Sequence, residues 1–212
     1  MLIDLHNHTW PSSDDSLLSP VELIQGAKKG GLDGICMTEH DWFWDPEEVV
    51  DLGKRMDFLV IPGVEITTEE GHLLVFGLGR YVFGMHRARF VKEVLDQNGG
   101  GAIVAAHPYR RQFKPEYNDK ASYEMAINKA CRNTIFSIVD GVEVLNGRGS
   151  ERENGFSLDV TRRLNLRGVG TSDAHQSHDI ARYATRFERR INGLEDLITE
   201  LRAGRFRPEV LR

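Results

Sequence analysis

Short apolar runs alternate with well-capped amphipathic segments along most of this chain, and that alternation limits the fold more than any other feature. Strand-like runs occupy residues 2–5, 34–37, 58–64, 73–76, 102–106, 142–145 and 168–170. Between them, Ser19-Pro20-Val21-Glu22 has the pattern of a helix capping box with proline at the first helical position, and Asp45-Pro46 repeats that logic. Strands that alternate with helices predict an α/β fold with a largely parallel sheet. About seven strand–helix units in 212 residues favour a barrel over an open sheet.

The composition is that of one ordinary globular domain spanning residues 1–212. A formal net charge of −5 gives no broad attraction to nucleic acid or to an anionic membrane, although it allows a local contact. The sequence has no apolar stretch of membrane-spanning length and no pattern of a secretory leader. Cys36 and Cys131 have no partner at metal-finger spacing, so we expect buried free thiols. These features predict a cytoplasmic protein with no membrane partner.

Histidine and acidic residues gather where the apolar runs end. The residues that follow such runs are His6, His8, His40, Glu65, His107, Asp173 and His175. In a barrel of parallel strands the carboxyl ends all emerge on one face, so these side chains would surround a single cavity. His72 instead precedes its run and needs a neighbouring loop or an antiparallel strand to reach that cavity.

These side chains form a donor set of nitrogen and oxygen atoms with no thiolate. Imidazole suits Zn and Fe, and added carboxylates admit Mn. Six histidines with two or three carboxylates are too many for one tetrahedral ion, so we expect two or three divalent ions that share a bridging carboxylate. Such clusters activate water and clamp a phosphoryl group, which favours hydrolysis of a phosphate ester.

Six ordered motifs, DLHNHT, TEHD, GVEI, GHLLVFG, AHP and GTSDAH, resemble those of the PHP (polymerase and histidinol phosphatase) family. The resemblance runs from residue 3 to about residue 175. It implies a distorted seven-stranded (β/α) barrel, TIM-like, with a trinuclear metal centre at the C-terminal ends of the strands and phosphoesterase activity. Two stretches depart from the family pattern: an S-D-G reads Asp14-Asp15-Ser16 here, and Glu39 of TEHD replaces the usual aspartate.

Carried over by motif, the resemblance divides the candidate ligands among three metal positions. The first would be held by His6, His8, Glu65 and Asp173. Glu65 would bridge to the second position, which His72 and His107 complete. The third would be held by His40 and His175, with Asp15, or Asp14 as the alternative. The expected catalytic residues are Asp173, His40 and His175, and either histidine would protonate the leaving group if the third metal is absent.

Arg110 and Arg111 follow His107 on a loop, where a planar guanidinium pairs well with phosphate oxygens, so we predict that they bind substrate. Glu143 and Asn146 match a strand that usually ends in asparagine in the PHP family, and they are expected to support the site.

The predicted substrate is a phosphorylated small molecule, a nucleotide or a short nucleic acid. Two other functions stay open: amidohydrolase-like hydrolysis of a non-phosphate bond, and metal binding in an inactive regulatory module. The sequence predicts no oligomeric state.

Overall fold

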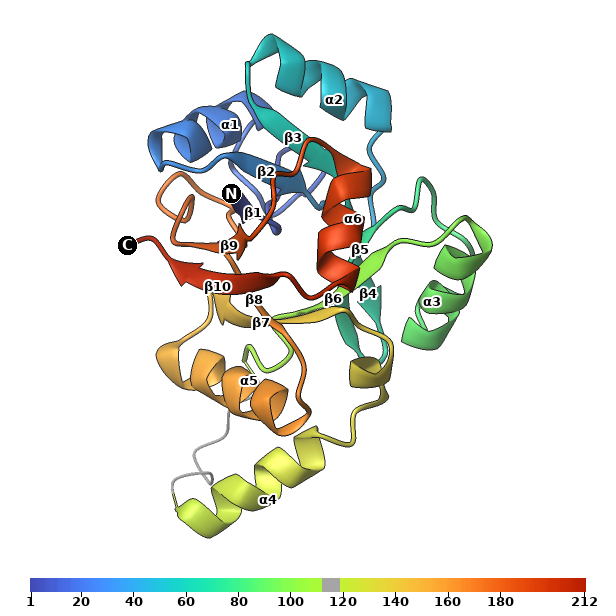
Figure 1. The fold of residues 1–212 in the computed structure, drawn as a ribbon, viewed down its shortest axis with the longest axis vertical. Coiled ribbons are helices and arrows are strands. Elements are labelled where there is room, and N and C mark those ends of the chain that lie inside the picture. The colour runs from blue at the N-terminus through green and yellow to red at the C-terminus, as the bar shows by residue number, and fades with distance from the viewer. Residues whose placement is uncertain (112–118) are drawn as a thin grey trace.

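The computed structural model describes residues 1–111 and 119–212. Within these ranges the strands are β1 (Leu2–Asp4), β2 (Gly34–Met37), β3 (Leu59–Pro62), β4 (Val64–Thr68), β5 (Gly71–Phe76), β6 (Ala102–Ala106), β7 (Gly141–Asn146), β8 (Gly168–Thr171), β9 (Tyr183–Phe187) and β10 (Phe206–Val210). The helices are α1 (Pro20–Lys29), α2 (Pro46–Arg55), α3 (Ala88–Gln97), α4 (Lys120–Ala130), α5 (Glu151–Arg163) and α6 (Leu194–Arg202), with a short 3-10 helix η2 (Thr134–Ser137). Figure 1 shows their arrangement.

The strands form two five-stranded sheets, ordered β10-β9-β1-β2-β3 and β4-β5-β6-β7-β8. Strands β1, β2 and β3 are parallel to one another, and so are β6, β7 and β8. Strand β5 is antiparallel to both β4 and β6, and β9 is antiparallel to both β1 and β10. Both sheets are therefore mixed, and helices α1, α2, α4 and α5 lie in the connections between their parallel strands.

The α/β class agrees with the sequence, but the predicted seven-stranded (β/α) barrel is wrong. The described strands form two separate sheets and no closed barrel. A (β/α) barrel needs a helical crossover between consecutive parallel strands. Here β4 passes into β5 through only Glu69 and Glu70, so β5 has to run antiparallel to β4. The antiparallel strands β9 and β10, which the sequence did not predict, extend the other sheet instead of closing a ring.

Two isolated parallel bridges join the sheets at the ends of their strands. One pairs Asn7 with Ala174, and the other pairs His40 with Glu65. The backbone N–H of His8 donates to the carbonyl of Ala174 at 3.0 Å beside the first bridge. The loops that carry the candidate ligands are therefore hydrogen-bonded directly to one another across the two sheets.

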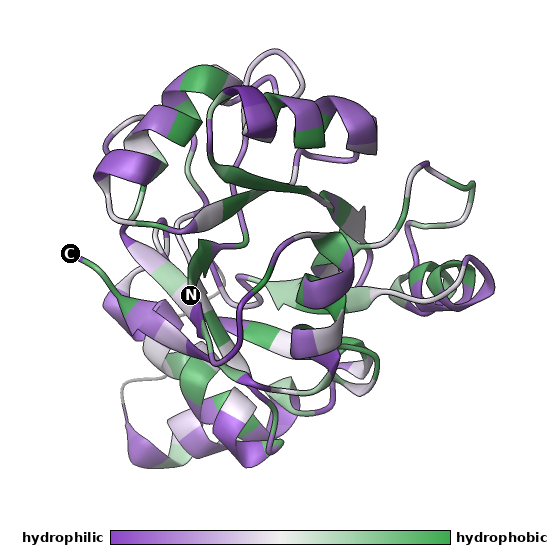
Figure 2. Ribbon diagram, turned by 45° about the horizontal axis from the view of Figure 1, so that its top comes forward, coloured by the Kyte–Doolittle hydropathy of each residue, from purple (hydrophilic) through white to green (hydrophobic). Residues whose placement is uncertain are grey.

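The helices begin where the sequence predicted caps. Ser19 and Glu22 form both halves of a capping box at α1, and the Asp45 carboxylate caps α2. Figure 2 shows apolar strands at the centre and helices with hydrophilic outer faces.

No helix in the described ranges is long and apolar enough to cross a lipid bilayer. Both cysteines are free thiols; Cys36 is buried as expected, but Cys131 is partly exposed.

Candidate metal centre

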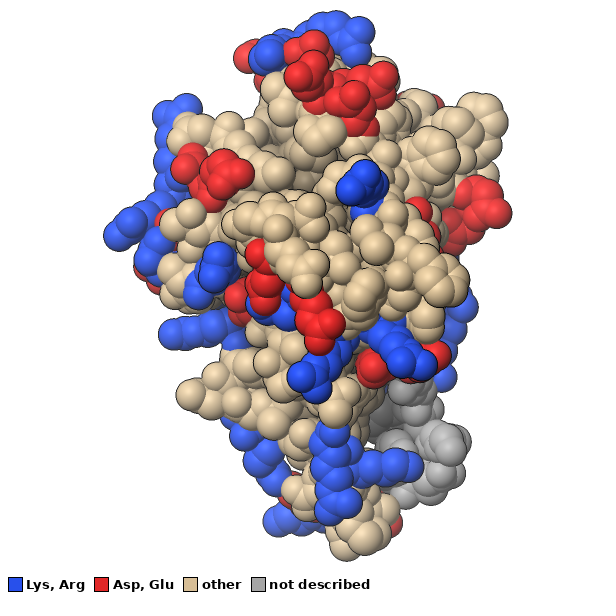
Figure 3. Space-filling view, turned by 90° about the vertical axis from the view of Figure 1, so that its right-hand side faces the viewer, with Lys and Arg blue, Asp and Glu red and all other residues tan. Residues whose placement is uncertain are grey.

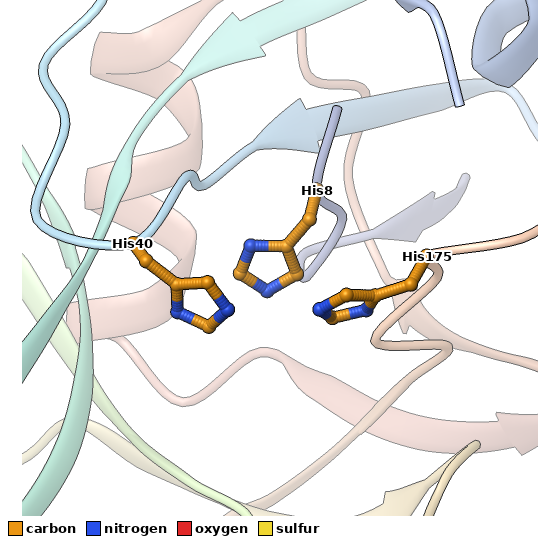
Figure 4. Close-up of side chains that lie close together, drawn as sticks. All are labelled: His8, His40 and His175. Carbon is orange, nitrogen blue, oxygen red and sulfur yellow. The ribbon is translucent and has the colours of Figure 1, made fainter. Parts of the chain in front are cut away.

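The ends of β1, β2 and β8 bring histidines together from distant parts of the chain. Figure 4 shows the imidazoles of His8, His40 and His175 pointing toward one another from three different loops. The ring centroid of His8 lies 4.0 Å from that of His40 and 4.3 Å from that of His175. The strand ends therefore gather these side chains as the sequence predicted, although the strands do not close into a barrel.

Four donor atoms converge at the first predicted metal position. The Nε2 atoms of His6 and His8 lie 2.8 Å apart. Oε2 of Glu65 is 3.2 and 3.3 Å from these two nitrogens, and Oδ1 of Asp173 is 3.7 and 3.5 Å from them. Ligands at Zn–N bond lengths around a tetrahedral ion are separated by roughly 3.3 Å. The atoms of His6, His8 and Glu65 are grouped closely enough to hold one cation, and Oδ1 of Asp173 lies beside both imidazoles.

Glu143 determines that Nδ1 of His6 carries a proton. The Nδ1 atom of His6 lies 2.7 Å from Oε1 of Glu143, a fully buried carboxylate that only accepts hydrogen bonds when ionised. Although burial raises the pKa of Glu143, its neighbour His6 holds that pKa below its usual range. Nδ1 of His6 must therefore carry the proton, which leaves a lone pair on Nε2 facing the cluster.

Ser13 and Glu39 fix the protonation of His8 in a similar way. The Ser13 hydroxyl donates to the buried carboxylate of Glu39 at 2.6 Å. Its oxygen is then free to accept a hydrogen bond from Nδ1 of His8 at 3.1 Å and from the backbone N–H of His40 at 3.2 Å. The proton of His8 therefore sits on Nδ1, and its Nε2 lone pair also faces the cluster.

Two imidazole lone pairs 2.8 Å apart repel each other unless a proton or a metal ion lies between them. Among the described residues, neither Oε2 of Glu65 nor Oδ1 of Asp173, both buried, accepts a hydrogen bond of good geometry, although Nδ1 of His40 lies 2.9 Å from Oε2. Burial lowers the pKa of His6, but the carboxylates of Asp173, Glu143 and Glu65 outweigh it and raise that pKa well above its usual range. The pocket thus favours positive charge, and the residues present fit a divalent cation.

Glu65 connects the first cluster to a second one. Its other oxygen, Oε1, lies 2.8 Å from Nδ1 of His72 and 2.9 Å from Nε2 of His107. His72 begins β5, and the antiparallel course of β5 brings its start beside the end of β6, where His72 pairs with Ala106. The carboxylate of Glu65 therefore lies between both clusters, which is the position of a bridging ligand.

A third group forms around the exposed carboxylate of Asp15. Its oxygens lie 3.4 Å from Nε2 of His40 and 3.1 Å from Nε2 of His175. Nδ1 of His175 donates to the backbone carbonyl of Asp173 at 2.9 Å, so its Nε2 presents a lone pair to this group. Burial and the neighbouring His8 lower the pKa of His175 to about 4. In the described structure these ion pairs run to Asp15, and none connects Asp14 to either histidine.

The two arginines predicted to bind substrate lie in different surroundings. The largely buried guanidinium of Arg110 forms an ion pair with Oδ2 of Asp173, so it reaches the first cluster. Arg111 is exposed, and its backbone N–H donates to the carboxylate of Glu153 at the start of α5. The structure therefore brings Arg110 to the site and leaves Arg111 at its edge.

Two supporting residues were missed in the sequence. No role was predicted for Ser13 from the sequence, because its contact with His8 depends on how the loop after β1 folds back. Asp4 is fully buried at the end of β1, where it accepts hydrogen bonds from the backbone N–H groups of His6 at 3.3 Å and Ser172 at 3.0 Å. Burial raises the pKa of Asp4 to about 7. Asp4 could have been identified from the sequence, because an acidic residue in an apolar strand is costly to bury unless it has hydrogen-bond partners.

An α/β fold that gathers imidazole and carboxylate groups at its strand ends defines a candidate metal-binding protein. Residues 4–139 match the model of the PHP domain family, and residues 151–206 match that of a PHP-associated family. Because the first match covers more than half of the chain, the chain belongs to the PHP domain family.

Several known proteins are similar to this chain over much of its length. An uncharacterized protein of Methanocaldococcus jannaschii is 29% identical over 157 residues, which cover 69% of this chain and 82% of that protein. A two-domain structure from Bacteroides vulgatus, described as containing a predicted PHP-like metal-dependent phosphoesterase, matches with a TM-score of 0.67 and 21% identity, covering 99% of this chain and 64% of that one. Histidinol phosphate phosphatase from Lactococcus lactis, complexed with zinc, L-histidinol and phosphate, matches with a TM-score of 0.51 and 15% identity, covering 83% and 87%. At these identities, the solved structures show a shared fold.

Proposed function

We propose that residues 1–212 form one catalytic unit, a metal-dependent phosphoesterase. One observation carries this proposal: the Nε2 atoms of His6 and His8 face each other at 2.8 Å, and one carboxylate oxygen each of Glu65 and Asp173 lies within 3.7 Å of both nitrogens. This arrangement is costly without a cation and matches a tetrahedral site with one.

The proposed ligands are divided among three positions. His6, His8, Glu65 and Asp173 hold the first ion; Glu65, His72 and His107 hold the second; Asp15, His40 and His175 hold the third. These groups suit Zn, Mn or Fe, and two or three ions are expected. When bound, such ions supply an activated water and neutralise charge on phosphoryl oxygens.

The chain's own residues position the substrate and handle protons. Arg110 is proposed to bind a phosphoryl oxygen, for which the substrate competes with its present partner Asp173. His40, whose side chain is 29% exposed, is proposed to hold a proton beside the leaving group when the third position is empty. His175 suits ligation better, since its Nδ1 is already committed to the carbonyl of Asp173.

A phosphate ester is favoured over the other substrates by the charge of the site. The guanidinium of Arg110, beside the metal-ligand cluster, can donate two parallel hydrogen bonds, which suits a phosphoryl group better than a neutral amide. The similar phosphatase from Lactococcus lactis was solved with zinc and phosphate, which agrees with this choice. An inactive regulatory module is disfavoured because all nine predicted ligands lie within the three groups described above.

The test is an activity screen of the zinc- and manganese-loaded protein against phosphate monoesters, diesters and amides. Hydrolysis of a phosphate ester that disappears in Asp173→Asn, together with two or three metal equivalents per chain, is the expected result. The matched control is Asp51→Asn, which changes an exposed carboxylate on α2. Full turnover by Asp173→Asn, or amide hydrolysis without ester hydrolysis, would overturn the proposal.

A further inference from the structure

Two of the proposed metal ligands have a left-handed backbone. The φ angle is 52° at Asp173 and 27° at His107. Residues with a side chain rarely adopt this conformation, although aspartate and histidine do so more often than most. It persists only where the surrounding structure holds it in place. Contacts with neighbouring segments must therefore fix the backbone at both ligands.

Hydrogen bonds to β1 and to the residues after it hold the backbone on both sides of Asp173. Before it, the N–H of Ser172 donates to Oδ1 of Asp4 at 3.0 Å. After it, the carbonyl of Ala174 accepts a hydrogen bond from the N–H of His8 at 3.0 Å. Asp173 follows β8 in one sheet, whereas Asp4 ends β1 in the other. The backbone of this ligand is therefore fixed across the junction between the two sheets.

Asp4 contacts a second ligand segment at the same time. Its Oδ1 atom also accepts a hydrogen bond from the N–H of His6, at 3.3 Å. One oxygen atom thus joins two segments from different sheets, and each segment carries a ligand of the first cluster. Because Asp4 is fully buried, removing its carboxylate would leave both N–H groups without this acceptor in the interior.

A second buried carboxylate makes the same kind of contact at the other left-handed ligand. Oε2 of Glu143, on β7, accepts a hydrogen bond from the backbone N–H of His107 at 2.7 Å. In both cases a carboxylate on one strand fixes the backbone of a ligand that follows another strand. This recurrence indicates that the contacts position ligands and do not only stabilise the core.

We propose that Asp4 is a positioning residue for the first metal position. Its contact with Ser172 holds the carboxylate of Asp173 beside the imidazole of His6, where Oδ1 lies 3.7 Å from Nε2. Asp4 belongs to none of the ligand groups among the described residues, so it acts through the backbone and not by ligation. The proposal rests on the proposed function, because it assigns a role at the cation site of that function.

Metal titration of the metal-free chain tests this role. Asp4→Ala is expected to lower the affinity for the first equivalent of zinc roughly 10–100-fold, measured by competition with a chromophoric chelator. It is also expected to change the visible spectrum of the cobalt-loaded protein, which reports the geometry of the ligands. Asp4→Asn keeps an acceptor oxygen for both N–H groups and is expected to restore most of the affinity and the wild-type spectrum.

The matched control is Asp140→Ala. The carboxylate of Asp140 accepts a hydrogen bond from the backbone N–H of Ile103 at 2.9 Å, at the end of β6 away from His107. This variant is expected to lower the free energy of unfolding while the zinc affinity and the cobalt spectrum stay unchanged. Figure 3 shows acidic side chains at several places on one face of the surface, where a cation can bind weakly. The titrations therefore contain excess magnesium, which takes oxygen ligands in preference to imidazole.

Unchanged affinity and spectrum in Asp4→Ala, or an equal change in Asp140→Ala, would overturn the inference. If Asp4→Ala is partly unfolded, the titration is repeated in trimethylamine N-oxide, which favours the folded state. A wild-type protein that binds zinc but hydrolyses no phosphate ester would reject the proposed function alone. Ester hydrolysis by the wild-type protein, together with wild-type zinc affinity in Asp4→Ala, would reject this inference alone.

Discussion

The proton on each cluster imidazole is set by a residue that does not itself point into the cluster. Glu143 holds the Nδ1 proton of His6, and Ser13, backed by Glu39, holds that of His8. The Nε2 atoms of both imidazoles are thereby oriented toward the cluster before any cation arrives, so a cation that replaces a proton there finds its nitrogen ligands already in place. The sequence predicted both histidines from DLHNHT, but it could not place Ser13, whose hydroxyl reaches His8 only because the loop turns back.

Exchanging the carboxylate of Glu143 for an amide tests this arrangement. In Glu143→Gln an amide N–H can face Nδ1 of His6, which moves the imidazole proton to Nε2 and removes the donor lone pair. We expect zinc affinity at the first site to fall roughly 10–100-fold, measured by competition with a chromophoric chelator. Glu151→Gln, at the exposed start of α5, is the matched control. Unchanged affinity in Glu143→Gln would show that His6 needs no carboxylate partner.

At the level of elements, local patterns in the sequence predicted individual strands and helix caps better than they predicted whether the strands close into a barrel. Each of the seven predicted runs overlaps a strand, and Ser19 and Asp45 cap their helices. The barrel failed because closure depends on strand direction, which changes where Glu69 and Glu70 make a turn too short for a helix. The ligands still converge, because hydrogen bonds between strand ends need no complete ring.

The turn before His72 has a backbone conformation that tests how the second cluster is built. Gly71 has a φ of +140°, which side-chain-bearing residues rarely adopt. Gly71→Ala is expected to destabilise the metal-free protein by about 1–3 kcal/mol and to displace His72. The control Gly155→Ala lies within α5, where an added Cβ would meet no atom within 4 Å other than its chain neighbours and the adjacent helix backbone. It should therefore stabilise by about 0.5–1 kcal/mol. Urea unfolding followed by circular dichroism measures both; equal stability of the two variants would contradict this account.

For the whole molecule, the proposed metal centre lies on the line where the two sheets meet. His6, His8 and His40 follow strands of one sheet. In the other sheet, Glu65 and His72 lie on strands, and His107 and Asp173 come just after strands. In the part of the chain that the structure describes, two isolated backbone bridges and a few hydrogen bonds between loops join the strand ends there. A cation bound by both groups would therefore stabilise the packing of one sheet against the other.

Zinc is accordingly expected to stabilise the entire fold. At a free concentration about 100 times Kd, one bound ion contributes about 2.7 kcal/mol, which raises Tm by roughly 5–10 °C for a chain of this size. Scanning calorimetry in zinc against chelator measures the shift, with magnesium as the ionic control. Asp173→Asn should lose most of the shift because the first cluster loses a ligand, while Asp51→Asn on α2 should retain it. Equal Tm values of the wild-type protein in zinc and in chelator would mean that these side chains hold no structural cation, and that the two sheets are joined by their own hydrogen bonds and apolar contacts alone.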